Sequence, residues 1–364
     1  MGGTEQDYVK EAFNSNWIAP LGPNVTGFET DLEHYLGENK SVACLSSGTA
    51  AIHLALVQLG VGQGDEIICQ SFTFCGSANP IIYQGAIPIF VDSEKETWNM
   101  CPEQLELAIT DRIKKGKTPK AIILVHLYGM PAKLDEIVNI ANKYGIPLIE
   151  DAAEALGSEY KGRKCGTFGL YSVLSFNGNK IITTSGGGAL VCSSKADKDQ
   201  TIFYATQARD KAPHYEHTNI GYNYRMSNIS AGIGRGQMEV LDNHVYSRQR
   251  MNEFYQQLFD DIDGVEVFSE QSSYCRSNHW LSCILFSSDS KVSRQQLKDS
   301  FESDNIESRA LWKPMHMQPI FAGFPTYLNG VSESLFRNGL CLPSGSNLTD
   351  GNRDRITKVI RDLF

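Results

Sequence analysis

The chain has 364 residues, which is enough for one large and one smaller domain, each with its own core. Hydrophobic residues make up 41% and charged residues 21%, as is ordinary for a soluble globular protein. The formal net charge is −9 and no basic run occurs, which argues against binding of duplex nucleic acid. An anionic substrate would therefore need a local basic pocket.

No stretch approaches 18 uninterrupted apolar residues, so no membrane span is expected. The first residues, MGGTEQDYVKEAF, lack the basic region and apolar core of a secretory signal. The cysteines are scattered without CxxC spacing, and their odd number argues against a closed set of disulfides. We expect a cytoplasmic protein with reduced thiols and no metal site. The nine cysteines are Cys44, Cys69, Cys75, Cys101, Cys165, Cys192, Cys275, Cys283 and Cys341.

Between residues 40 and 195, apolar strand-like runs alternate with helical patterns. This alternation predicts an α/β fold whose mostly parallel sheet is covered by helices on both faces. Ligands of such sheets lie at the carboxyl ends of the strands. The predicted helices lie at 49–60, 101–109 and 133–145, and the predicted strands at 41–45, 65–70, 87–92, 121–127, 146–151, 171–176 and 188–192.

A long helical pattern from 228 to 262 is interpreted as a bridge between domains. After it come a strand at 279–288, a helix at 293–305 and a final helix at 350–364, which together predict a small α+β domain. We therefore divide the chain into a large domain at 1–245, including an N-terminal helix, and a small C-terminal domain at 246–364.

The first motif with chemical content is SSGTAAIHLAL, which follows the predicted strand at 41–45. Residues Ser46 to Thr49 are expected to form a turn, and Ala50 to open a helix. Free N–H groups and the helix dipole favour a phosphate there, and the hydroxyls of Ser47 and Thr49 add donors. A plain helix cap is the alternative interpretation.

Asp151 ends the very apolar strand IPLIED, where a carboxylate is costly unless it is paired. A protonated pyridine nitrogen would be a suitable partner, and pyridoxal phosphate (PLP) needs such a carboxylate to keep its ring an electron sink. A surface carboxylate or a metal ligand are the alternatives.

Lys180 lies in the segment YSVLSFNGNKIITTSGGGALV, inside a loop rich in Asn, Gly and Ser between two apolar strands. Such a lysine is expected to point into the protein, and buried lysines are suited to Schiff-base chemistry. Ser175 ends the strand before it. An ordinary loop lysine is the alternative.

Two further segments carry weaker signals. Phe74, in SFTFCGSANPI, stands at a strand end and is either a ring that stacks on a cofactor or a core aromatic. Asn223 and Arg225, in IGYNYRMSNI, stand at the start of the long helix. Arg is suited to phosphate or carboxylate recognition, whereas helix capping is the alternative role of this segment.

Taken together, these motifs resemble those of the DegT-type sugar aminotransferases, a branch of the fold-type-I PLP enzymes. The resemblance covers nearly the whole chain and rests on the order and spacing of several blocks. These blocks are SSGTAAI, SFTF, EDAAEALG, SFNGNKIITTSGGGAL and GYNYRMSNI.

The resemblance implies PLP as the cofactor, with pyridoxamine phosphate as its form between two half-reactions. Lys180 would bond to the cofactor and then carry the proton, and Asp151 would pair with the pyridine nitrogen. The remaining implied cofactor contacts are Glu154 near the phenolic oxygen, Phe74 on the ring face, Gly48, Thr49, Ala50 and Ser175 at the phosphate, and Asn223 reaching that phosphate from the neighbouring subunit of a homodimer.

The stretches NWIAPLGPNV, TQARDKAPHYEH, RALWKPMHMQPIF and GLCLPSG are most similar to enzymes that aminate UDP-linked 4-keto-6-deoxy-N-acetyl sugars in bacillosamine-type pathways. Glutamate is the implied amino donor. Other nucleotides and 3-keto sugars stay open. The expected groups for the substrate are Arg225, Lys313 and His316, with Arg209, Trp312, Trp17 and Asn16 as weaker candidates.

Two alternatives come from other classes. A non-catalytic PLP-fold protein that binds an amino sugar is disfavoured by the set Lys180, Asp151 and Ser175. A cysteine desulfurase would need a cysteine in a mobile glycine-rich active loop, and the sequence places none there.

Overall fold

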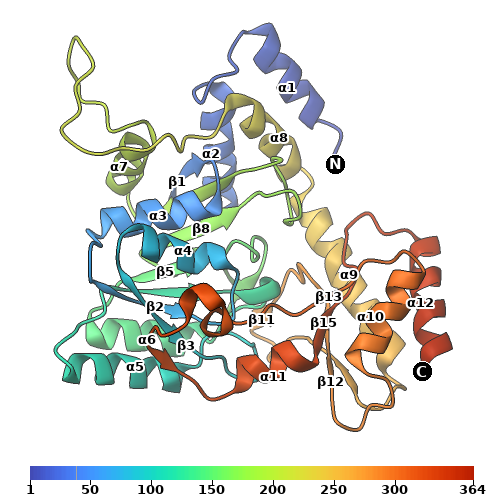
Figure 1. The fold of residues 1–364 in the computed structure, drawn as a ribbon. Coiled ribbons are helices and arrows are strands. Elements are labelled where there is room, and N and C mark those ends of the chain that lie inside the picture. The colour runs from blue at the N-terminus through green and yellow to red at the C-terminus, as the bar shows by residue number, and fades with distance from the viewer. Residues whose placement is uncertain (38) are drawn as a thin grey trace.

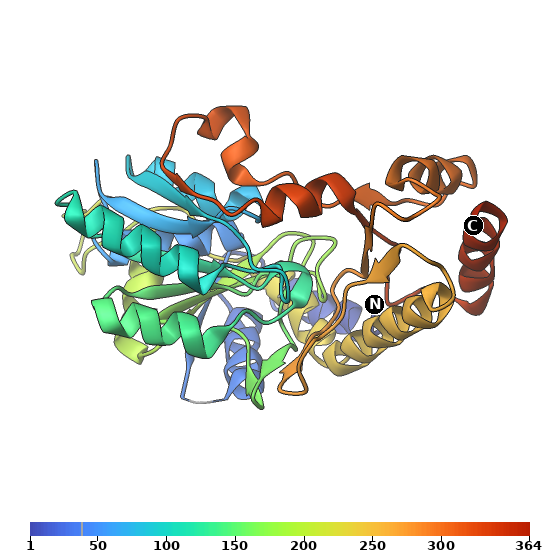
Figure 2. The same ribbon diagram turned by 90° about the horizontal axis from the view of Figure 1, so that it is seen from below.

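A computed structural model describes residues 1–37 and 39–364. A large α/β part and a smaller part lie side by side, joined by a long helix (Figures 1 and 2). Within the described residues, no helix combines the length and the apolar character needed to cross a membrane.

The large part is built on an eight-stranded sheet. Its strands are in the order β1-β9-β8-β5-β4-β2-β3-β14, and β9 alone runs antiparallel to its neighbours β1 and β8. The mostly parallel sheet of the prediction is thereby confirmed. The strands are β1 (Ser41–Leu45), β2 (Glu66–Gln70), β3 (Ile87–Val91), β4 (Ala121–Val125), β5 (Leu148–Asp151), β8 (Tyr171–Ser175), β9 (Gly188–Cys192) and β14 (Thr326–Tyr327).

Helices cover both faces of this sheet, so its strands are apolar on both sides. In β2, Ile67 and Cys69 pack under one layer of helices, whereas Ile68 packs under the other. The first layer holds α3 (Gly48–Gln58), α4 (Cys75–Tyr83) and α7 (Lys195–Ala205), and the second holds α2 (Pro23–Leu36), α5 (Pro102–Lys114), α6 (Leu134–Tyr144) and α8 (Asn228–Met238).

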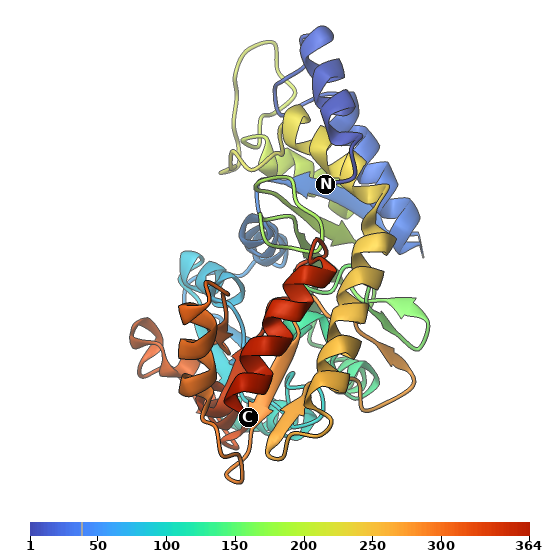
Figure 3. The ribbon, with the colours of Figure 1, turned by 90° about the vertical axis from the view of Figure 1, so that its right-hand side faces the viewer.

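The smaller part is an antiparallel sheet in the order β10-β12-β15-β13. Its core joins α9 to the C-terminal helix, which lie alongside each other in Figure 3. The elements are β10 (Val265–Val267), β12 (Cys283–Phe286), β13 (Arg309–Ala310), β15 (Gly339–Cys341), α9 (Leu241–Phe259), α10 (Arg294–Ser303), α11 (Val331–Asn338) and α12 (Asp350–Leu363).

The single helix predicted for 228–262 is wrong, because the structure has two, α8 and α9, with a break at Val240. The two helices have different partners. α8 packs on α1 (Glu5–Asn14) so closely that a Cβ at Gly236 would lie 2.6 Å from the backbone nitrogen of Glu5. α9 runs on into the core of the smaller part, and the break lets the chain change direction between them.

The chain returns to the large part after β13. Met315 and Phe321 pack in the core beneath α3 and α4, and β14 adds a parallel strand beside β3. A three-stranded sheet also joins β11 (Cys275–Arg276) to β6 (Glu159–Tyr160) and β7 (Arg163–Lys164). The division near residue 245 stays a proposal; β14, which that division assigns to the small domain, pairs with the sheet of the large part.

The first and last residues of the triple glycine, Gly186 and Gly188, differ in what surrounds them. Gly188 pairs with Leu45 across β9 and β1, and a Cβ there would lie 2.3 Å from the nitrogen of Gly48. A Cβ added at Gly186 would have no other atom within 4 Å. Gly188 is therefore the position that lets β9 approach the start of α3.

We predict that Gly188→Ala lowers the free energy of unfolding by about 1–3 kcal/mol, because the added methyl group must push the Ser47–Gly48 backbone. Urea denaturation measures the change. Gly186→Ala is the matched control and should leave stability within about 0.5 kcal/mol of the parent. Equal effects of the two variants would contradict this account.

Candidate active site

A cavity of about 840 Å³ lies between the carboxyl ends of the central strands and the smaller part of the molecule. It lies where a parallel sheet is expected to bind its ligand. The structure brings most of the expected cofactor residues to its wall, namely Gly48, Thr49, Phe74, Asp151, Glu154, Ser175 and Lys180.

The turn after β1 forms one end of the cavity. Helix α3 begins at Gly48 rather than at Ala50, because Ser47 is the N-cap and its hydroxyl accepts a hydrogen bond from the N–H of Ala50 at 3.0 Å. Ala50 is buried and does not line the cavity. The helix start thus places Gly48 and Thr49, with Ser175 of β8 opposite, where a phosphate would be held.

Asp151 is buried at the end of β5. One carboxylate oxygen accepts a hydrogen bond from Ser77 at 2.6 Å, and the other accepts one from the N–H of Ala153 at 3.2 Å. The hydroxyl of Ser77 lies 2.7 Å from that of Thr73. Burial raises the pKa of Asp151, and the bond from Ser77 and the charge of Lys180 oppose that rise. The sequence pattern did not point to Ser77.

Lys180 points into the same cavity and contacts Glu154. Its Nζ atom lies 3.3 Å from Oε1 of Glu154, and 12% of the lysine side chain is exposed. The other oxygen of Glu154 accepts the N–H of Tyr128 at 2.7 Å. Burial raises the pKa of Glu154 to about 7, although Lys180 opposes the rise. A carboxyl that titrates near neutral pH therefore adjoins the lysine amine.

Phe74 caps the N-terminus of α4 and lines the cavity. It is 58% exposed, so the core-aromatic alternative is wrong. Its ring centroid lies 5.6 Å from that of Trp312, which also lines the cavity. An exposed ring at the mouth of a pocket is suited to stacking on a planar ligand.

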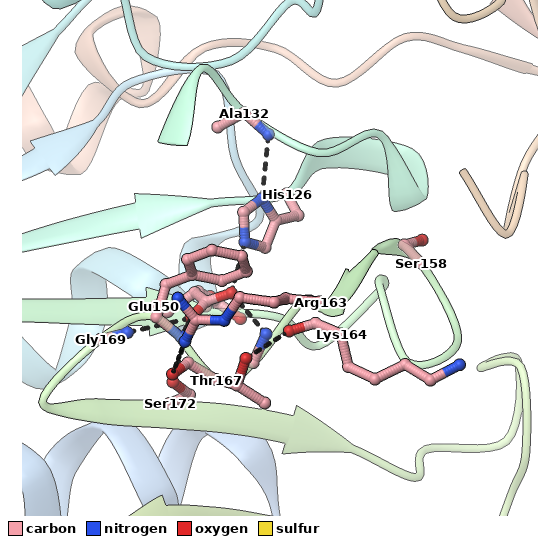
Figure 4. Close-up of polar contacts among 12 residues, drawn as sticks. His126, Ala132, Glu150, Ser158, Arg163, Lys164, Thr167, Gly169 and Ser172 are labelled. Atoms are coloured by element: carbon pink, nitrogen blue, oxygen red, sulfur yellow. Dashed lines mark hydrogen bonds and ion pairs between the residues drawn. The ribbon is translucent and has the colours of Figure 1, made fainter. Parts of the chain in front are cut away.

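A hydrogen-bond network behind the site holds the ends of β4 and β5 in place (Figure 4). The N–H of Ala132 donates to Nδ1 of His126, so Nε2 carries the hydrogen and donates to Glu150 at 2.7 Å. Glu150 also accepts hydrogen bonds from three backbone N–H groups of the loop before β8 and from the hydroxyl of Ser172 in that strand. Cys165 lies near this pair. Because the histidine and the carboxylate are already hydrogen-bonded to each other, we interpret the three residues as a structural contact rather than a metal site.

Two residues of the GYNYRM segment do not line the cavity of their own chain. Asn223 is exposed and accepts a hydrogen bond from Gln207 at 3.1 Å. The Arg225 guanidinium pairs with the buried Glu29 and donates to the carbonyl of Cys44 at 2.9 Å. Arg225 therefore holds β1 against α2, and its charge is balanced within the chain.

The other expected substrate residues also lie outside this cavity wall. His316 bonds to Ser71 at 2.7 Å and to Glu333 at 3.4 Å, and neither His316 nor Lys313 lines the cavity. The lining cations of the described chain are Lys180, Arg309 and Arg355.

The weaker candidates are scattered. Trp17 is half exposed beside α8, where its carbonyl accepts from Asn228, and Asn16 precedes it with φ of 57°. Arg209 lies over the ring of Tyr215 at 4.3 Å in the long segment between α7 and α8. That segment projects away from the body of the molecule (Figure 1).

The wall of the cavity fits a PLP group. It offers a buried carboxylate with no ion pair inside the described chain, a lysine amine, a helix start beside a serine, and an exposed aromatic ring. These are partners for a pyridinium, an aldehyde, a phosphate and a ring face. Together with the eight-stranded sheet, they define a fold-type-I PLP-dependent transferase.

Comparison with known proteins agrees with this class. The model of the DegT/DnrJ/EryC1/StrS aminotransferase family matches residues 1–361, and the chain belongs to that family. It is a PLP-dependent sugar aminotransferase.

Three relatives illustrate the range of the family. EpsN of Bacillus subtilis (strain 168), whose naming as a PLP-dependent aminotransferase is itself provisional, is 49% identical over all of this chain and 94% of its own length. GDP-perosamine synthase of Caulobacter vibrioides is 35% identical over all of this chain and 96% of its own length. A crystal structure of a DegT DnrJ EryC1 StrS aminotransferase from Brucella abortus superposes with a TM-score of 0.91 at 31% identity, covering 99% and 95%.

We predict that the Glu154 carboxyl makes stability depend on pH. An unfolded glutamate ionises near 4.5 and folded Glu154 at about 7, so its ionisation favours the unfolded state increasingly as pH rises through that window. In cofactor-free protein, Glu154→Gln should therefore weaken the loss of stability between pH 5 and 7.5 in urea denaturation. Glu253→Gln, at an exposed position on α9, is the control, and equal pH dependence of both variants would contradict the prediction.

Proposed function

We propose that this enzyme moves the amino group of glutamate onto the keto carbon of a nucleotide-linked 4-keto-6-deoxy sugar, with a UDP-linked N-acetyl sugar as the preferred class. The observation that carries the proposal is the pair of Lys180 and the buried Asp151 in one cavity of about 840 Å³. That volume is in the range of sites for ligands larger than an amino acid.

The charges of the cavity support an anionic substrate. Arg309 pairs with Glu307 at the rim, whereas Arg355 donates to the carbonyl of Asp304 and has no ion pair within the described part of the chain. Both arginines come from the smaller part and line the same cavity as the helix start that would hold the cofactor phosphate. We assign the diphosphate of the substrate to this side, in place of Arg225, Lys313 and His316.

PLP, when bound, supplies an electron sink for the electrons left behind when a substrate carbon loses its proton. Asp151 keeps a positive charge favourable at the ring nitrogen, because it is a carboxylate buried away from water. Lys180 moves the proton, since its amine points into the cavity beside Glu154. Glu154 orients that amine. Near neutral pH its carboxyl alternates between a protonated form, which donates a hydrogen bond, and an ionised form, which accepts one.

Two other substrate classes are alternatives to the proposed one. The relation to GDP-perosamine synthase supports a GDP-linked sugar as the second candidate. A 3-keto sugar is the third.

A non-catalytic regulator is set aside by membership of the aminotransferase family. A desulfurase is disfavoured because the cysteine at the described cavity wall, Cys341, is buried in β15 rather than on a mobile loop.

We further propose that the active site is completed in a homodimer in the cytoplasm. Asn223 is exposed and does not line its own chain's cavity, as expected for a residue that serves the partner's cofactor phosphate. Several large apolar side chains are exposed on the large part, including Phe13, Leu21, Tyr215 and Ile220. The molar mass in solution tests this, and a monomer with full activity would contradict it.

We predict that the protein with PLP shows a visible absorption band and that Lys180→Ala loses it, because the covalent bond to the lysine is lost. Asp151→Asn should keep the fold but lower kcat by at least about a hundredfold, since the charge at the ring nitrogen is no longer balanced. Absorption spectra and glutamate-dependent turnover measure both. A lysine variant that kept the band and the turnover would contradict the assignment.

We predict that a panel of nucleotide keto sugars, incubated with enzyme, PLP and glutamate, gives an amino sugar from UDP-linked 4-keto-6-deoxy-N-acetyl sugars at the highest kcat/KM. Product mass and NMR identify the amine. Arg355→Gln should raise KM for the nucleotide sugar by about tenfold, because one charged contact to the diphosphate is lost, and should leave KM for glutamate unchanged. Preference for a GDP-linked or 3-keto sugar would replace the proposed substrate.

A further inference from the structure

Trp280 forms the wall of the cavity beside Lys180. It lies just before β12, a hundred residues after the lysine in the sequence, and is 2% exposed. The Nζ atom of Lys180 lies 4.3 Å from the centre of the indole ring. This is the geometry of a cation–π contact, which is strongest when the groups are shielded from water.

Several hydrogen bonds fix this ring in place. The indole N–H donates to the carbonyl of Asn179, the residue before the lysine, at 2.8 Å. The backbone N–H of Trp280 donates to Oδ1 of Asn278 at 2.9 Å, and Arg248 of α9 donates to its carbonyl. The indole therefore binds the loop of the lysine while its own backbone is held from α9.

The same short segment also holds the loop of Glu154. The amide of Asn278 donates to the carbonyls of Glu154 and Leu156, at 2.8 and 2.9 Å. The backbone N–H of Asn278 donates to Ser158 at 2.9 Å. One segment of the chain thus sets the positions of both groups that contact the amine of Lys180.

We propose that Trp280 is a positioning residue that holds the amine of Lys180 beside the cofactor while the lysine is not bonded to it. This inference rests on the proposed role of Lys180 and goes beyond it. The amine must accept a proton from one carbon and return it to another, so it must stay within reach of both.

The ring suits this task better than Glu154 alone. Glu154 titrates at about 7, so its negative charge varies around neutral pH. The attraction of an indole face for an ammonium group does not depend on a titrating partner. Trp280 therefore supplies a contact that persists when Glu154 is protonated.

Three variants test the proposal in the half-reaction with glutamate, which needs no nucleotide sugar. Trp280→Leu removes the ring, and Trp280→Phe keeps a ring face but loses the N–H bond to Asn179. Phe268→Leu is the matched control, because Phe268 belongs to the same apolar cluster and stacks on Trp98 rather than contacting Lys180.

With PLP bound, the rate at which glutamate bleaches the visible band should fall on the order of tenfold in Trp280→Leu, with KM for glutamate little changed. Trp280→Phe should keep most of the rate, and Phe268→Leu all of it. If the leucine variant does not fold, Trp280→Met replaces it, because the flexible methionine side chain fills irregular space better. A phenylalanine variant as slow as the leucine variant, or an equally slow control, would overturn the proposal.

A second readout uses the full-length protein without cofactor. The rate at which an amine reagent modifies Lys180, followed by mass spectrometry, should rise at least about threefold in Trp280→Leu but not in Phe268→Leu, because the indole ring no longer covers the amine. An unchanged rate would overturn the proposal. Absence of any visible band in the parent protein with PLP would instead overturn the function proposed for Lys180.

Discussion

The buried carboxylate of Asp151 is the constraint around which the active site is arranged. A carboxylate at the end of an apolar strand is costly to ionise, and its oxygens must find donors. Ser77 and the N–H of Ala153 supply two donors, but neither is a cation. A protonated ring nitrogen would satisfy the remaining demand for positive charge.

The order of the strands brings the other partners to the same place. β8 lies directly beside β5 in the parallel direction, so Ser175 and Asp151 end at one edge of the sheet. β9 returns antiparallel between β8 and β1, and its Gly188 allows the start of α3 to come close. The phosphate end and the nitrogen end of a cofactor are thus set by strand order, while the loop between β8 and β9 supplies the lysine.

Local patterns were enough to find the parts of the site that depend on single strand ends. Asp151 and Lys180 stand out because a charged residue follows or interrupts an apolar run, and the strands themselves are short and continuously apolar. Patterns failed where a residue has a partner far away in sequence. Arg225 looked free but pairs with Glu29, and the helix at 228–262 looked continuous although its two halves pack on different cores.

The residues that sequence reasoning missed share that property. Ser77 belongs to the site because it donates a hydrogen bond to Asp151, which is 74 residues away in the sequence. The contact of Trp280 with Lys180 depends on the smaller part packing against the large one. A hydroxyl four residues after another, as in Thr73 and Ser77, was the one available local hint of a chain of donors. Tertiary packing, rather than composition, decides which such pairs meet.

Two carboxyls near one lysine have different roles because their surroundings differ. Burial raises the pKa of Asp151, and the hydrogen bond from Ser77, whose hydroxyl lies beside that of Thr73, opposes this rise. Glu154 faces the amine across 3.3 Å and is buried enough to titrate at about 7. Asp151 is accordingly suited to pairing with a ring nitrogen, whereas Glu154 contacts the amine of Lys180 directly.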